Sequence, residues 1–116
     1  DAINEHPAVA ESAIVGFPHD IKGSALYGYI TLKDTGESRN HDNLRSEINQ
    51  LITDRIGPIA KLDKMQFTNG LPKTRSGKIM RRILRKIACN ETDNLGDTST
   101  LLNQEVVQEI VDNALS

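Results

Sequence analysis

A loop and a basic helix meet in the stretch LPKTRSGKIMRR, which spans Leu71–Arg82. Pro72 restricts the backbone, Gly77 permits dihedral angles that other residues resist, and the Ser76 hydroxyl can hydrogen-bond locally. The stretch therefore predicts a loop of defined shape that presents Lys78 to an anionic reaction centre.

We expect the helix to run from Lys78 to about Ala88. Backbone N–H groups and the positive end of the helix dipole attract anions to a helix N-terminus. An anion at this point would therefore meet both the helix end and the Lys78 ammonium. One side of the helix is apolar, with Ile79, Ile83, Leu84 and Ile87, and the other is basic, with Arg81, Arg82, Arg85 and Lys86.

A nucleotide-binding P-loop is the nearest alternative motif, and the sequence excludes it. The first glycine of that motif would fall on Pro72, and the residue after the lysine is Ile79 rather than a magnesium-binding Ser or Thr. From charge alone, a solvated helix face is the first interpretation. Nucleic-acid contact, membrane contact and a nuclear localisation signal remain open beside it.

Length and composition fit one small domain. With 116 residues, of which 37% are hydrophobic, the chain can bury a single modest core. Tryptophan is absent and aromatic residues make up 3%, which argues against base-stacking platforms and an aromatic-walled ligand pocket. We therefore expect the substrate pocket to lie outside this chain, and nucleic acid not to be its partner.

The formal charge of -2 hides a strong asymmetry, because no acidic residue occurs from Lys64 to Asn90. Cys89 is the single cysteine and cannot form an internal disulfide, which suits a reducing compartment. We expect an intracellular protein, cytoplasmic in the first place, with mitochondrial or nuclear location as the alternatives in a eukaryote.

No apolar run approaches the ~20 residues that span a bilayer, and no signal peptide is recognisable. We therefore expect no membrane partner. The opening Asp1-Ala2-Ile3-Asn4 is typical of the end of a helix already under way, so we expect a fragment of a longer protein.

Two strands are predicted in the first third of the chain. Ala10–Phe17 is rich in small and β-branched residues and stops at Pro18, and a second strand runs from about Ala25 to Leu32. A turn at Ile21-Lys22-Gly23 would pair them antiparallel. In the second strand Leu26, Gly28, Ile30 and Leu32 are expected to face inward, and Tyr27, Tyr29 and Thr31 to point the other way.

A helix follows, with Asp42 as its N-cap and Gly57-Pro58 as its stop. Its apolar residues at helical spacing are Leu44, Ile48, Leu51, Ile52 and Ile56. We next expect a short strand from Asp63 to Thr68, a loop over Asn69–Gly77, and a polar stretch from Asn90 to Thr100. A last amphipathic helix carries Val106, Val107, Ile110, Val111 and Leu115.

This order of elements predicts an α+β domain, in which helices flank a small central antiparallel or mixed sheet of about three strands. We assign residues 1–116 to one domain and residues 90–116 to a C-terminal extension that includes the last helix.

Leu71–Ala88 resembles the C-terminal signature of the acyl-adenylate-forming enzymes, and in detail that of AMP-forming acetyl-CoA synthetases. Pro-x-x-x-x-Gly-Lys alone is shared with luciferases and peptide-synthetase adenylation domains, but the combination with Leu95–Leu101 is far more selective. The resemblance covers nearly the whole chain, except the variable Asp34–Asn43 and about the last dozen residues. Similar segments elsewhere are Glu5–Glu11, Val15-Gly16, Pro18-His19, Ile21–Gly23, Ile56–Pro58 and Asn94–Leu101.

The resemblance implies the mobile C-terminal lid of an enzyme that converts ATP, acetate and CoA into acetyl-CoA, AMP and pyrophosphate through an acetyl-adenylate. It implies that Lys78 is the catalytic lysine of adenylation, on a loop supported by Gly77, Ser76 and Pro72. The large domain, absent here, would bind ATP with magnesium, the acyl group and most of CoA, so this domain alone is expected to be inactive. Propionyl-CoA or another short-chain acyl-CoA synthetase is the alternative.

In this family the C-terminal domain rotates between the two steps, so that a different face completes the CoA site. A CoA-contacting arginine of bacterial relatives aligns with Thr53, a departure from the pattern, and Arg55 is the candidate that would replace it. The resemblance also implies that Lys78 is a regulatory site, modified by a protein acetyltransferase and restored by a sirtuin-type deacetylase.

The remaining polar residues predict no further site. His6, His19 and His41 lie apart with no Cys or Glu at ligand spacing, so we expect no metal site. Cys89 is interpreted as an ordinary thiol. Two rival classes remain, namely a basic module that binds nucleic acid with salt-sensitive affinity and a fragment that acts through protein contacts.

Overall fold

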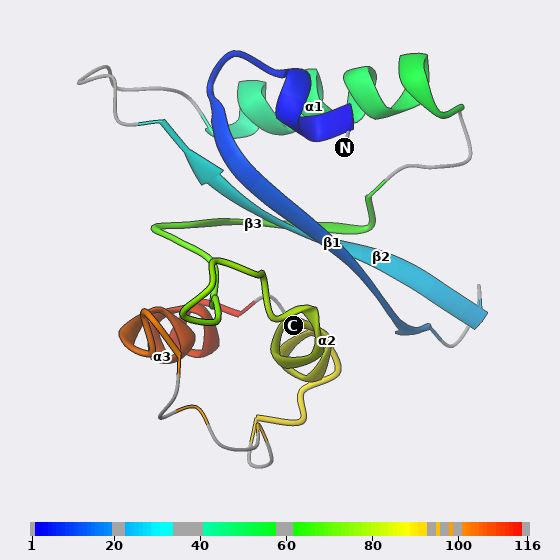
Figure 1. Cartoon of the computed structure of the whole chain (residues 1–116). Coiled ribbons are helices and arrows are strands. Elements are labelled where there is room, and N and C mark those ends of the chain that lie inside the picture. The colour runs from blue at the N-terminus through cyan, green and yellow to red at the C-terminus, as the bar shows by residue number, and fades with distance from the viewer. Residues whose placement is uncertain are drawn as a thin grey trace.

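A three-stranded sheet lies at the centre of the computed structural model, which describes residues 2–19, 23–33, 41–57, 62–92, 95, 98 and 101–114. Three helices and one 3-10 turn surround it (Figure 1). In chain order the elements are η1 (Ala2–Glu5), β1 (Val9–His19), β2 (Gly23–Leu32), α1 (His41–Arg55), β3 (Lys64–Thr68), α2 (Arg81–Ala88) and α3 (Glu105–Asp112).

The sheet is mixed, with β2 in the middle. β1 pairs with β2 antiparallel, placing Ser12 opposite Ile30, and β2 pairs with β3 parallel, placing Tyr27 opposite Lys64. Parallel pairing requires a crossover, and α1 supplies it on one face of the sheet. The predicted α+β class and the antiparallel first pair are confirmed.

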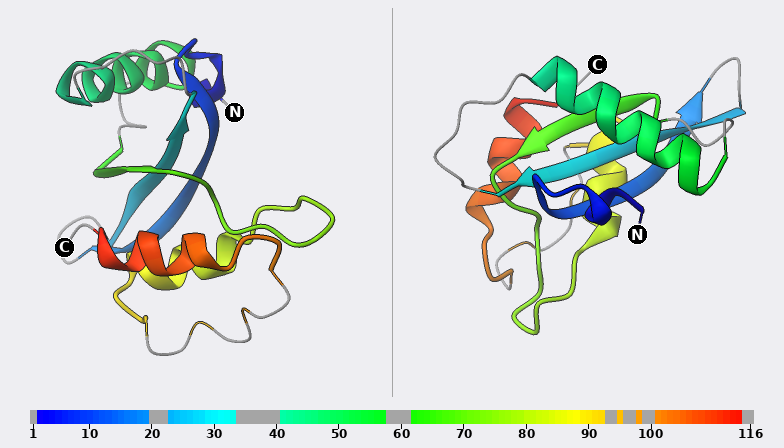
Figure 2. Two further views of the ribbon diagram at one scale, coloured as in Figure 1. Left: turned by 90° about the vertical axis from the view of Figure 1, so that its left-hand side faces the viewer. Right: turned by 90° about the horizontal axis from the view of Figure 1, so that it is seen from above.

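Helices cover both faces of the sheet. η1 and α1 lie on one face, and α2 and α3 lie side by side on the other (Figures 1 and 2). Each face consequently has its own apolar cluster. The α1 side contains Ile3, Val9, Ile30, Ile48, Ile52, Leu62 and Met65. The α2–α3 side contains Ala13, Val15, Phe17, Ala25, Tyr27, Tyr29, Leu71, Ile83, Leu84, Ile87, Ala88, Leu101, Val106, Val107 and Ile110.

The prediction that only one face of β2 turns inward is wrong. Tyr27 and Tyr29 are fully buried, because α2 and α3 cover the side on which they lie. Ile30 is fully buried on the α1 side, where Gly28 also lies. A Cβ on Gly28 would stand 2.6 Å from Leu62 Cδ1, so the absence of a side chain lets the chain before β3 pack closely.

Buried polar groups of the tyrosine face tie the sheet to both C-terminal helices. Tyr29 Oη donates to the carbonyl oxygen of Leu84 at 2.9 Å, which links β2 to α2. Tyr27 Oη donates to Gln66 Oε1 at 2.5 Å, and Gln66 Nε2 donates to the carbonyl oxygen of Ile110 in α3 at 3.2 Å. These bonds satisfy hydroxyl and amide groups that would otherwise be costly to bury.

Several predicted boundaries shift. β1 continues through Pro18 to His19, which is possible because β1 is an edge strand and need not donate from every residue. Asp42 lies inside α1 rather than at its N-cap, and Ile56 is 63% exposed beyond the helix end. The predicted turn at residues 21–22, the predicted helix stop at Pro58 and Leu115 lie outside the described residues.

Replacing Tyr29 with Phe should lower the free energy of unfolding of the chain by about 1–2 kcal/mol, because Leu84 loses its donor in a buried site. Urea unfolding at pH 7, followed by circular dichroism, measures the difference. An unchanged midpoint with an unchanged slope would mean that the hydroxyl adds nothing to stability.

The same variant has a pH signature. Burial, reinforced by neighbouring Tyr27, raises the pKa of Tyr29 far above its usual value. The phenol of the unfolded chain ionises above pH ~10 while the folded one stays neutral, so stability present below that pH is lost as pH rises beyond it. Urea midpoints measured between neutral and alkaline pH should fall less steeply for Tyr29→Phe than for the unaltered chain.

Candidate functional site

The loop that carries Lys78 is a short hairpin that projects from the body of the domain (Figure 2, left). Lys73 and Ile79 form an antiparallel bridge between its two arms. The amide of Met80 donates to the carbonyl oxygen of Pro72 at 2.8 Å, and that of Thr74 to the carbonyl oxygen of Lys78 at 2.9 Å. Backbone pairing, rather than a packed core, therefore gives the projecting part its shape.

A tight turn closes the tip. The amide of Gly77 donates to the carbonyl oxygen of Thr74 at 2.9 Å, and Gly77 has a φ of 90°, which favours glycine. Thr74 Oγ1 lies 2.8 Å from Ser76 Oγ and accepts the amide of Lys78 at 3.1 Å. Two residues chosen from the sequence, Ser76 and Gly77, thus help to form this turn, whereas Pro72 is buried at its base.

Lys78 does not lie at a helix start, so that prediction is wrong. α2 begins at Arg81, and the backbone of Lys78 is instead paired with Thr74 across the hairpin. The side chain of Lys78 is exposed beside the turn. Because the dipole of a helix acts within about its first turn, α2 adds little to an anion held at Lys78.

The base of the hairpin is attached to β1 by an ion pair that the sequence did not predict. Lys73 Nζ lies 2.5 Å from Glu11 Oε2, and the two side chains are 27% and 26% exposed. Glu11 Oε1 is buried and has no hydrogen-bond partner among the described residues. Glu11 is therefore a half-buried carboxylate that forms its ion pair with Lys73.

The chain after α2 contacts the same base. Asn103 Nδ2 donates to the carbonyl oxygen of Leu71 at 2.8 Å, and Asn103 Oδ1 accepts the amide of Lys73 at 3.1 Å. The amide of Leu102 donates to the carbonyl oxygen of Lys73 at 2.9 Å. Glu11 ends the family-like segment Glu5–Glu11 and Asn103 lies outside every such segment, but neither residue is placed beside the hairpin by the sequence alone.

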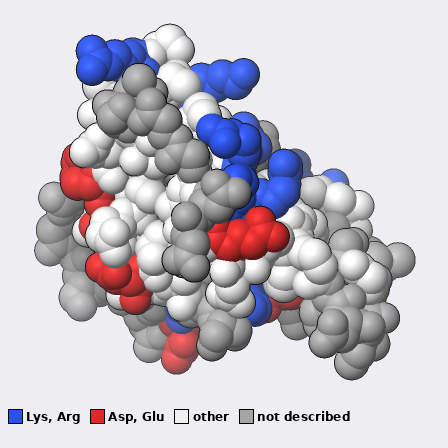
Figure 3. Space-filling model, turned by 90° about the horizontal axis from the view of Figure 1, so that it is seen from below, with Lys and Arg blue, Asp and Glu red and all other residues white. Residues whose placement is uncertain are grey.

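Basic side chains gather near the hairpin. Arg81, Arg82 and Arg85 are exposed on α2, on the side opposite its buried residues, as the sequence predicts. Figure 3 views the α2–α3 side of the domain and shows Lys and Arg collected toward one part of that surface. An anionic partner or substrate approaching Lys78 would therefore meet a positive field.

Arg55 lies away from Lys78. It ends α1, on the opposite side of the sheet from α2 and α3, and its Nε is 3.3 Å from Glu5 Oε2. Thr53 is half-buried on the same helix. The domain thus presents the predicted adenylation lysine and the candidate CoA-contacting arginine on different sides.

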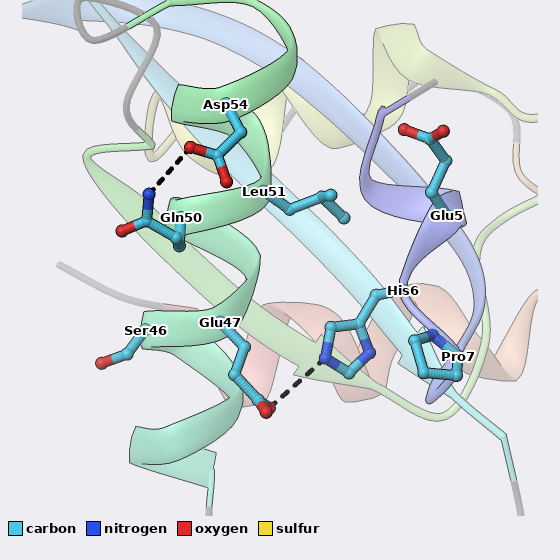
Figure 4. Close-up of a pocket in the computed structure, with 8 residues that line it drawn as sticks. All are labelled: Glu5, His6, Pro7, Ser46, Glu47, Gln50, Leu51 and Asp54. Carbon is cyan, nitrogen blue, oxygen red and sulfur yellow. Dashed lines mark hydrogen bonds and ion pairs between the residues drawn. The ribbon is translucent and has the colours of Figure 1, made fainter.

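A groove lies between η1 and α1. Its volume is about 660 Å³, and Figure 4 shows His6 pointing across it to Glu47, with Nε2 3.3 Å from Oε2. The amide of Ala8 donates to His6 Nδ1, so that nitrogen is the acceptor of the ring.

Within the described residues no three His, Cys, Asp or Glu side chains are grouped to hold a metal ion, and no helix is long and apolar enough to cross a membrane.

Comparison with known proteins gives concordant matches. A model of the AMP-binding enzyme C-terminal domain matches residues 1–78. Acetyl-coenzyme A synthetase of Syntrophobacter fumaroxidans is 60% identical over 112 residues, which are 97% of this chain and 17% of that protein. That of Saccharophagus degradans is 57% identical over 111 residues, again 17% of its length.

Solved structures agree with the fold. An acyl-CoA synthetase of Brucella canis is 33% identical, has a TM-score of 0.66 and covers 73% of this chain and 15% of its own. Acetoacetyl-CoA synthetase of Streptomyces lividans covers 96% of this chain and 16% of its own with a TM-score of 0.76. At 18% identity the second likeness concerns the fold alone.

The sheet covered on both sides and its projecting hairpin therefore define a domain with the fold of acyl-CoA synthetase C-terminal domains. The chain belongs to the AMP-binding enzyme C-terminal domain family, whose model matches residues 1–78. It spans about a sixth of the length of the curated relatives it matches, which are named acetyl-coenzyme A synthetase.

Replacing Lys73 with Met should destabilise the domain by about 1–3 kcal/mol, because it leaves the Glu11 carboxylate half-buried and unpaired. The double variant Glu11→Gln, Lys73→Met should recover part of that loss. Urea unfolding of the unaltered chain, Glu11→Gln, Lys73→Met and the double variant gives the coupling energy. Arg55→Met is the control, since its pair with Glu5 is more exposed and should be worth less than about 1 kcal/mol. Additive effects of Glu11 and Lys73 would refute the coupling.

Proposed function

We propose that this domain is the C-terminal lid of an AMP-forming acetyl-CoA synthetase and that Lys78 is its adenylation lysine. The observation that carries the proposal is the exposed lysine at the turn of a hairpin that projects from the sheet and its helices. The identity of 60% to a protein named acetyl-coenzyme A synthetase supports the choice of acetate. Propionate or another short-chain acid is the alternative substrate.

The first step of the proposed reaction joins two anions. A carboxylate oxygen of acetate attacks the α-phosphorus of ATP, the bond to the β-phosphate oxygen breaks, and pyrophosphate leaves with its magnesium. The product is acetyl-adenylate. A positioned ammonium offsets the repulsion between the reactants and the charge that develops as the bond forms, which is the role we assign to Lys78.

The second step transfers the acetyl group. The sulfur of CoA attacks the carbonyl carbon, the thiol proton is lost to solvent or a base, and AMP leaves with the electrons of the broken C–O bond. ATP, magnesium and most of CoA would be bound by the remainder of the protein, since the relatives are about six times as long as this chain. Alone, the domain would be inactive.

The separation of Lys78 and Arg55 supports a lid that rotates between the steps. In one orientation the hairpin would enter the reaction centre, and in the other the α1 side would face CoA. We propose Arg55 as a CoA contact on that side, which requires its pair with Glu5 to open. Rotations of this kind commonly gate multistep enzymes.

Exposure of Lys78 also supports regulation by modification. We propose that a protein acetyltransferase acetylates its Nζ and that a sirtuin-type deacetylase restores it, because acetylation removes the charge on which adenylation depends. The enzyme would act inside the cell, in the cytoplasm or, in a eukaryote, in mitochondria or the nucleus. A nucleic-acid or protein interaction module is the rival function, and it assigns no catalytic role to Lys78.

Lys78→Ala in the full-length protein should slow acetate-dependent ATP–pyrophosphate exchange by about 10²–10³-fold, a loss of about 3–4 kcal/mol in transition-state stabilisation. Acetyl-CoA formation from supplied acetyl-adenylate should largely survive. Lys33→Ala, at another exposed lysine, is the matched control and should leave both rates unchanged. If neither half-reaction responds to Lys78→Ala, the lysine belongs only to a basic surface and the rival function replaces this one.

A further inference from the structure

The segment after α2 pairs with the base of the Lys78 hairpin as a neighbouring strand would. The side-chain oxygen of Asn103 accepts a hydrogen bond from the backbone amide of Lys73, and its side-chain nitrogen donates one to the carbonyl oxygen of Leu71. Residues 71 and 73 are two apart, so their polar groups face the same edge of an extended chain. One side-chain amide therefore occupies the place that a backbone peptide group takes in a sheet.

We propose that Asn103 is a positioning residue for Lys78, which holds the base of the hairpin so that the lysine reaches the reaction centre in one place. The proposal rests on the function proposed above. It assigns a role in adenylation to the C-terminal segment, which lies beyond the residues 1–78 that match the family model.

Asn103 is itself well fixed. Leu101, before it, is 7% exposed in the apolar cluster, and Val106, Val107 and Ile110 of α3 are buried after it. The Glu109 carboxylate of α3 accepts both the backbone and the side-chain N–H groups of Asn69, at 3.1 and 3.0 Å. The C-terminal segment therefore forms hydrogen bonds with the residues on both sides of Gly70.

Close packing at Gly70 supports the same attachment. A Cβ on that residue would stand 3.3 Å from Val106 Cγ2 and 3.8 Å from Asn103 Nδ2. Within the described part of the chain, by contrast, the bonds that hold the tip of the hairpin lie inside the hairpin itself. Rotation about its base would therefore displace Lys78, and a shift of about 1 Å at a reaction centre can cost 10²-fold in rate.

The test compares three variants of the full-length protein. Asn103→Ala removes both side-chain bonds. Asn103→Asp keeps an oxygen for the amide of Lys73 but removes the donor to Leu71. Asn113→Ala is the matched control, because that exposed asparagine lies in the same segment and its side chain donates to the carbonyl oxygen of Glu109 rather than to the hairpin.

We expect Asn103→Ala to lower kcat for ATP–pyrophosphate exchange by about 10–100-fold, with KM for ATP and acetate within about twofold. Acetyl-CoA formation from supplied acetyl-adenylate should stay within the same twofold margin. Asn103→Asp should fall between Ala and the unaltered protein, and Asn113→Ala should match the unaltered protein. Amide hydrogen exchange in residues 69–80 should be faster by about tenfold in Asn103→Ala, by less in Asn103→Asp, and unchanged in Asn113→Ala.

Three results would overturn the inference. The first is unchanged adenylation in Asn103→Ala when Lys78→Ala abolishes it. The second is an equal fall in both half-reactions, which a general loss of folding would cause. The third is unchanged adenylation in both Lys78→Ala and Asn103→Ala, together with faster amide exchange in residues 69–80 of Asn103→Ala. That result overturns the proposed function and, with it, the role of Asn103, while leaving the contact between Asn103 and the hairpin intact.

Discussion

Burial of β2 on both faces constrains everything else in this domain. Tyr29 can be fully buried only because its hydroxyl donates to Leu84, and that bond fixes α2 beneath the sheet. β3 is fixed beside β2 by parallel pairing. The chain between Thr68 and Arg81 must therefore join two anchored elements, and it does so by doubling back as a hairpin that leaves the body. The exposed lysine is a consequence of that route.

Much of the fold could be predicted because the signals are local. Small and β-branched residues mark β1, alternating apolar residues mark β2, and apolar residues at helical spacing mark α1, α2 and α3. The burial of Tyr27 and Tyr29 could not be predicted, because the helices that cover them lie more than fifty residues away in sequence. Tyrosine carries no periodic signal that separates a buried phenol from an exposed one.

The candidate site divides in the same way. Lys78, Gly77 and Ser76 follow from their motif, since the hairpin turn needs a residue that accepts positive φ and a local hydroxyl. The helix start was placed three residues too early, because Ile79 continues the apolar period of α2 while its backbone pairs with Lys73. Glu11 and Asn103 are single polar residues whose partners appear only once the chain is folded.

A hairpin offers the proposed chemistry something that a helix N-terminus does not. Amides at a helix N-terminus hold an anion close to the body of the domain, whereas an ammonium on a projecting turn can reach into a reaction centre and leave it when the domain rotates. Withdrawal matters in the proposed two-step reaction, because AMP must depart after the acetyl group has moved to CoA. A permanent cationic contact would hold that anion as firmly as it holds the transition state, and would slow its release. The placement of Lys78 outside α2 therefore suits a charge that is required in one step and unwanted in the next.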